Sequence, residues 1–242
     1  MKNLHILIAL LLCIALFSDC MSKEEIPDES GPLIITNDYT LSNEPESSYT
    51  PEQALVDFQS VNSDVIGVIR IEDTLLDYPL MYREGEEEYY LRKDINENYS
   101  TAGLPFMQQG CSLDDGNVFI YGHYYKNGEM FGCIHNYLYN VLYYIEHPII
   151  DIYTESEHQQ WKIFAVCEMN IWDEGFVYNR NKYIEFETEG EFNMYMSQVL
   201  KNNTIETEER AHFGDRILFL STCKDYSENS THRVVAFAKK IE

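Results

Sequence analysis

Basic residues are scarce in this sequence. Only 17 lysines and arginines stand against 41 aspartates and glutamates, which gives a formal net charge of −24 at pH 7. A surface charge of this sign and size repels polyanions, so we expect no nucleic acid among the partners. The sequence also shows no internal repeat and no glycine-rich phosphate loop.

Long hydrophobic runs are almost absent as well. One apolar run, Leu4–Phe17, follows Lys2 and ends before Asp19, and it is shorter than the roughly 20 residues that span a bilayer. A cleaved signal peptide, a short uncleaved anchor and, less favoured, lipidation of Cys20 all fit, and we favour the anchor because no cleavage pattern follows. We therefore predict a signal peptide or membrane anchor over residues 1–21, contact with the membrane through this segment, and a location at the extracytoplasmic face of the cell membrane.

The rest of the chain is interpreted as one domain behind an acidic spacer. Residues 22–49 are rich in Glu, Asp, Ser, Asn and Pro, which predicts a solvated, flexible spacer. Thr50, Pro51 and Gln53 then supply an N-cap, a first-turn proline and a capping-box partner for a helix. We expect a catalytic domain over residues 50–242, because a chain with 45% apolar residues can close a core without disulfides.

Short apolar runs separated by polar turns predict a mostly β fold, closed or sandwich-like, and the nineteen tyrosines suit pleated surfaces. One long interruption, Phe192–Leu200, has helical spacing and follows a capping box of Thr188 and Glu191. The strand-like runs are Val65–Ile71, Leu75–Met81, Val118–Tyr121, Ile149–Thr154, Trp161–Cys167, Ile217–Leu220 and Val234–Ala238.

Reactive side chains gather around the last two predicted strands. Cys223 follows the run Ile217–Leu220, and Arg233 precedes the run after it. If these strands pair antiparallel, the thiol and the guanidinium share one rim, where a cation favours thiolate and stabilises an oxyanion. His123, at the end of another strand-like run, could transfer protons in such an acyl transfer, although alone it would more often be a structural histidine.

Four blocks of this sequence resemble the class B sortases, which are cysteine transpeptidases of Gram-positive bacteria. Their joint order of His, Cys and Arg is more specific than any block alone. The blocks are Asn117–His123 with Met130–Gly132 and Tyr137 after it, Leu220–Cys223, Arg233–Lys239, and Tyr90–Asp94 with Gly103–Phe106 after it.

This resemblance implies an eight-stranded β-barrel with an N-terminal helix and a long helix in the loop before the cysteine strand. It implies that Cys223 attacks an Asn-Pro-x-Thr type sorting signal after threonine and forms a thioester, which a peptidoglycan precursor amine resolves. His123 would be acid and then base, and Arg233 would bind the oxyanion. The substrate partners would be secreted proteins that bear sorting signals, and we expect a monomer without cofactor or metal.

Substrate-binding residues follow from the same resemblance, which points to Asp94, Tyr121, Ser221 and Thr222. Tyr124 and Lys224 depart from the family pattern, and so does Asp94, which stands where asparagine is often found. These departures leave the peptide preference open.

Other interpretations of the sequence also stay open. A cysteine hydrolase or a pilin polymerase on the same scaffold would keep the thiol chemistry, and a binding domain with an inert Cys223 would not. Cys111 and Cys133 could form a disulfide, whereas Cys167 is expected to be a small core residue. A zinc site of Cys133 and His135 is set aside, since a second ligand pair at suitable spacing is missing.

Overall fold

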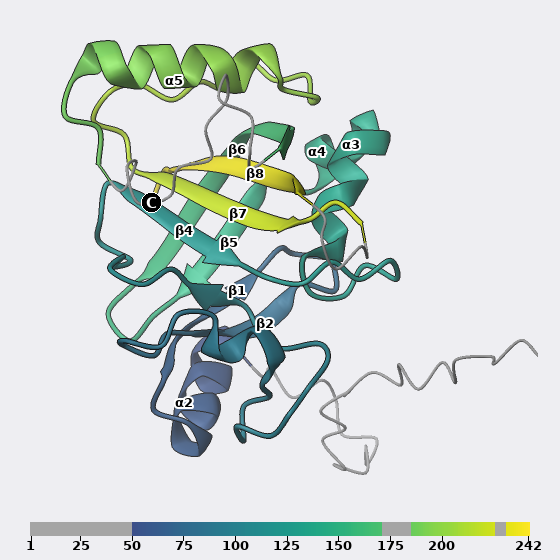
Figure 1. The fold of residues 1–242 in the computed structure, drawn as a ribbon, viewed down its shortest axis with the longest axis vertical. Coiled ribbons are helices and arrows are strands. Elements are labelled where there is room, and N and C mark those ends of the chain that lie inside the picture. The colour runs from purple at the N-terminus through teal and green to yellow at the C-terminus, as the bar shows by residue number, and fades with distance from the viewer. Residues whose placement is uncertain (1–49, 171–184, 226–230) are drawn as a thin grey trace, which may run out of the picture. The chain divides into compact units, whose positions relative to one another are not determined.

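A computed structural model describes residues 50–170, 185–225 and 231–242, and in these ranges eight strands form a closed barrel (Figure 1). The order around the barrel is β1-β2-β3-β4-β7-β8-β6-β5, so the predicted eight-stranded, mostly β fold is confirmed. The strands are β1 (Val65–Arg70), β2 (Asp77–Met81), β3 (Phe106–Met107), β4 (Asn117–Tyr121), β5 (Ile149–Tyr153), β6 (His158–Asn170), β7 (Ile217–Cys223) and β8 (His232–Lys240).

Two longer helices flank the barrel at the places that their caps predict. In α2 (Pro51–Val61), the Thr50 side chain accepts the Gln53 N–H at 3.3 Å. In α5 (Glu189–Lys201), which lies between β6 and β7 in the chain, Thr188 accepts the Glu191 N–H. The shorter helices are η1 (Tyr89–Arg92), η2 (Phe131–His135), α3 (Asn136–Tyr139) and α4 (Val141–Glu146).

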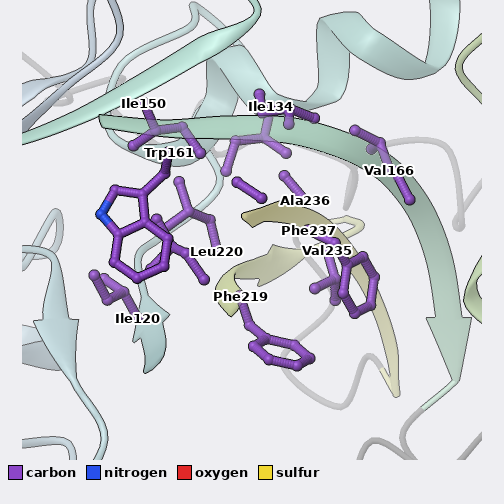
Figure 2. Packing of buried hydrophobic residues seen from close by; sticks show 14 of the residues in the cluster. Ile120, Ile134, Ile150, Trp161, Val166, Phe219, Leu220, Val235, Ala236 and Phe237 are labelled. Carbon is purple, nitrogen blue, oxygen red and sulfur yellow. The ribbon is translucent and has the colours of Figure 1, made fainter. Parts of the chain in front are cut away.

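Aromatic and branched side chains of the strands and of α5 pack together in the main buried cluster (Figure 2). Phe119 of β4 stacks on Phe219 of β7, with ring centroids 4.1 Å apart, and Phe219 meets the edge of Phe237 of β8 at 5.1 Å. Trp161 of β6 is also fully buried. Because burying a phenylalanine contributes roughly 1.5–3 kcal/mol, this stack fixes β4, β7 and β8 firmly to one another.

The expected membrane-anchored location is not supported and must be corrected. In the described ranges no helix is both long and apolar enough to cross a membrane. The longest of them, α5, has 13 residues, whereas a spanning helix needs roughly 20. Residues 1–21, on which the expectation rested, lie outside the described residues, and so does the predicted spacer at residues 22–49.

The disulfide that the sequence left open does not form in the structure. Cys111 and Cys133 are both free thiols and both buried. Cys167 is fully buried in the core, as predicted. The barrel is therefore held by its apolar packing and its strand ladders, without a covalent link among the described cysteines.

Candidate active site

Strands β4, β7 and β8 are neighbours in the barrel (Figure 1). They bring His123, Cys223 and Arg233 to one of its ends. Strands β4 and β7 run parallel, and their last register pair joins Tyr121 to Ser221. His123 and Cys223 each lie two residues beyond that pair. Strand β8 runs antiparallel to β7, and Arg233 is the register partner of Cys223. Since neighbouring strands lie about 4.8 Å apart, the three residues share one rim.

Cys223 is the accessible thiol among the described cysteines. It is the last residue of β7 and is partly exposed, whereas Cys111, Cys133 and Cys167 are buried. Burial raises the pKa of each buried thiol, to about 12 for Cys133. Because the thiolate is the nucleophile, these three thiols are poor candidates for attack at neutral pH.

His123 is oriented by a backbone carbonyl. Its Nε2–H donates to the Leu91 carbonyl oxygen at 2.8 Å, and because a carbonyl only accepts, Nε2 must carry the hydrogen. Burial of the half-buried ring lowers its pKa below the usual value, the charge of Arg92 lowers it further, and the bond to Leu91 opposes both. His123 is therefore mostly neutral at pH 7, with a lone pair on Nδ1.

Replacing Arg92 with alanine should raise the pKa of His123, because the nearby positive charge that disfavours the imidazolium is removed. An NMR titration of the His123 ring measures this shift directly. Arg92 is exposed and donates from Nη1 to the Thr101 carbonyl at 2.7 Å. Arg92→Lys keeps the charge and should leave the titration close to that of the wild type. Equal titrations in both variants and the wild type would contradict the role of Arg92.

Arg233 lies across the β7–β8 ladder from Cys223. It is partly exposed, and its Nη1 donates to the carbonyl oxygen of the neighbouring His232 at 3.1 Å. The ladder continues with a bond from the Lys224 N–H to the His232 carbonyl at 3.0 Å. A guanidinium beside a thiol on a rigid ladder can stabilise negative charge that develops near the sulfur.

Of the four expected substrate-binding residues, two make side-chain hydrogen bonds within the fold and two are buried. The Asp94 carboxylate accepts the N–H groups of Asn96 and Asn98, each at 2.9 Å, and so closes its own turn. The Tyr121 hydroxyl donates to Gln108 Oε1 at 2.7 Å. Ser221 and Thr222 are each 2% exposed. Within the described residues, Thr222 Oγ1 is a buried oxygen without a hydrogen-bond partner.

His135 belongs to this site, although the sequence pattern did not indicate it. Its Nε2–H donates to the Cys223 carbonyl oxygen at 3.0 Å, and its ring stacks on Tyr124 with centroids 3.8 Å apart. Burial lowers its pKa. No group of three metal-ligating side chains occurs in the part of the chain that the structure describes. His135 thus supports the backbone of Cys223. The sequence feature that could have pointed to His135 is its place in the segment after the His123 block.

Comparison with known proteins gives one consistent match. A family model described as the sortase domain matches residues 69–241. Sortase B of Listeria monocytogenes is 29% identical over 189 residues, which cover 77% of this chain and 74% of the relative. Sortase B of Staphylococcus aureus is 26% identical over 188 residues, which cover 76% and 73%.

A solved structure agrees with the sequence matches. The structure of a Staphylococcus aureus sortase B–substrate complex superimposes with a TM-score of 0.69 at 26% identity, and the match covers 79% of this chain and 86% of that chain. The region matched by the family model includes β4, β7 and β8. His123, Cys223 and Arg233 therefore all fall inside it.

Proposed function

Because the chain belongs to the sortase family of cysteine transpeptidases, and to its class B, we propose that it cleaves an Asn-Pro-x-Thr type sorting signal after threonine. The new carboxyl end would be joined to an amine of a peptidoglycan precursor. The observation that carries this proposal is the common rim of β4, β7 and β8. There Arg233 is the register partner of Cys223, and His123 lies just beyond the end of β4.

The first half of the reaction forms a thioester. His123 Nδ1 takes the proton of the Cys223 thiol. The sulfur then attacks the carbonyl carbon of the threonine in the sorting signal. The tetrahedral intermediate collapses, the peptide C–N bond breaks, and the proton on His123 passes to the leaving amine. A neutral imidazole with its lone pair on Nδ1 is suited to accept that proton.

The second half reverses these steps with a new amine. The incoming amine attacks the thioester carbon, and its surplus proton passes to His123 Nδ1. The C–S bond breaks, the thiolate of Cys223 leaves, and the proton returns to the sulfur. In both halves the Arg233 guanidinium stabilises the oxyanion, a type of contribution typically worth 10²–10³ in rate.

Substrate contacts remain part of the proposal. Tyr121, Ser221 and Thr222 end the two parallel strands that lead to the site, and Asp94 holds the turn after η1. We propose that these residues shape the groove for the sorting peptide, with the protein acting as a monomer.

Mass spectrometry of the purified protein tests this function. The protein is incubated with panels of Asn-Pro-x-Thr and Leu-Pro-x-Thr peptides, with and without oligoglycine or diaminopimelate. We expect an acyl adduct on Cys223 with Asn-Pro-x-Thr peptides, which the amine converts into a ligated product. A further reaction offers a pilin peptide with a lysine as the acceptor amine. Cleavage without ligation to any of these three amines would instead indicate a hydrolase. The absence of any adduct across the panel would reject the transpeptidase.

A further inference from the structure

The hydrogen bond between His123 and Leu91 joins the site to a distant part of the chain. Leu91 lies in η1, 32 residues before His123. The Leu91 carbonyl oxygen is the described partner of His123 Nε2, so its position determines how the imidazole is held. Whatever fixes this carbonyl also fixes the ring nitrogen that carries the hydrogen.

Gly103 packs directly against that carbonyl. Its φ is +59°, a left-handed conformation that glycine adopts easily. A Cβ at this position would lie 2.4 Å from the Leu91 carbonyl oxygen and 2.6 Å from the Tyr90 carbonyl oxygen. Both atoms belong to the backbone, so they cannot rotate away as the end of a side chain would.

Further contacts hold η1 in place. The buried Tyr90 donates its hydroxyl hydrogen to Asp64 Oδ2 at 2.6 Å, and its carbonyl accepts the Leu104 N–H at 3.0 Å. Arg83 Nε donates to the same Asp64 oxygen at 2.6 Å, and its guanidinium lies 4.0 Å from the centre of the Tyr89 ring. Because η1 cannot shift as a unit, we expect a side chain at position 103 to displace the Leu91 and Tyr90 carbonyls.

We propose that Gly103 is a positioning residue, which holds the Leu91 carbonyl so that His123 keeps its hydrogen on Nε2 and presents the Nδ1 lone pair. The catalytic consequence of this arrangement rests on the proposed function, but the arrangement itself is a property of the ring. In this role Gly103 acts on His123 through the Leu91 carbonyl.

The test begins with the unmodified protein and then compares two variants. Nitrogen NMR of the His123 ring should show the Nε2–H tautomer in the wild type. Gly103→Ala should give a mixture of tautomers, a lower His123 pKa because the carbonyl bond that raises it is lost, and kcat/KM reduced about 10- to 100-fold for the sorting peptide.

Gly110→Ala is the matched control. Gly110 also has a positive φ, +75°, but a Cβ there meets no atom within 4 Å. This variant has the same kind of backbone strain without moving a carbonyl, so its tautomer, titration and kcat/KM should match those of the wild type. The difference between the two variants therefore isolates the contact with Leu91.

Two results would overturn the proposal. One is an Nδ1–H tautomer in the wild type, a measurement that does not depend on whether Gly103→Ala folds. The other is a Gly103→Ala protein whose His123 tautomer and titration equal those of Gly110→Ala. If the tautomer shifts as expected but no peptide is ligated by any of the proteins, the positioning role stands and the proposed function fails.

Discussion

Cys223→Ala is expected to abolish the acyl adduct and to reduce peptide ligation by at least about 10³-fold, which corresponds to roughly 4 kcal/mol of transition-state stabilisation. The reason is that the reaction depends on a thiolate attacking the peptide carbonyl, and alanine offers no nucleophile. The other described thiols cannot substitute, because they are buried and burial raises their pKa. Intact-protein mass spectrometry and chromatography of the ligated peptide measure both effects.

Cys111→Ala serves as the control for thiol removal. Cys111 is 5% exposed and lies in the apolar core cluster, so its loss should leave adduct formation close to that of the wild type. Iodoacetamide should likewise modify the wild type and Cys111→Ala on Cys223. An adduct of unchanged yield in Cys223→Ala would show that the nucleophile is another residue.

His123→Ala is expected to reduce ligation by about 10²–10⁴-fold, the usual range for a lost general acid–base group. Both halves of the proposed reaction need a proton carrier, so thioester formation and its resolution by the amine should both slow. Mass spectrometry of samples quenched at successive times separates the two steps. Thioester formation is measured as growth of the acyl adduct, and its resolution by the amine is measured as decay of the adduct. Cys223 should remain open to alkylation, because it stays partly exposed at the end of β7.

His158→Ala removes a histidine from the opposite end of the same sheet. His158 begins β6 and pairs with Asp151 at 2.7 Å, whereas the site lies where the other end of β6 pairs with His232 and Arg233. Ligation by this variant should therefore stay near the wild-type rate. If His123→Ala ligated as fast as His158→Ala, the proton carrier would have to be sought elsewhere on the rim.

Local sequence patterns predicted most of the strands and both longer helices. Thr50 and Thr188 act as N-caps because the residues three positions later present free N–H groups to their side chains. The runs that became β4 and β7 are apolar and buried along nearly their whole length, as central strands are. These features depend on neighbours in the chain, and short-range pattern can therefore detect them.

Features set by distant parts of the chain could not be predicted in this way. The two-residue β3 exists because the barrel closes around it, with one register pair to β2 at Met81 and Phe106. Polar residues such as His158 extend β6 beyond the predicted run because they pair with β5. Such strands depend on the partner ladder and not on their own hydrophobicity.

The candidate site shows the same division. Strand-end placement singled out His123, Cys223 and Arg233, and the resemblance to a family gave them roles. Neither showed that β4 and β7 are parallel neighbours, since about a hundred residues separate them in the chain. His135 lies in a short 3-10 helix without periodicity, so its place after the His123 block was the one sequence signal for it, and its bond to the Cys223 carbonyl could not be predicted. The contact of Gly103 with Leu91 likewise requires the folded backbone.

Strand β7 is hydrogen-bonded along both edges, to β4 on one side and to β8 on the other. An inner strand of this kind cannot peel away by itself, because two ladders and the stacked phenylalanines would have to separate together. Its amide protons should therefore exchange with solvent only when the whole barrel unfolds. The nucleophile thus sits at the end of a strand that is held on both sides, and we expect the adjustments that admit a peptide to be made by the segments around it.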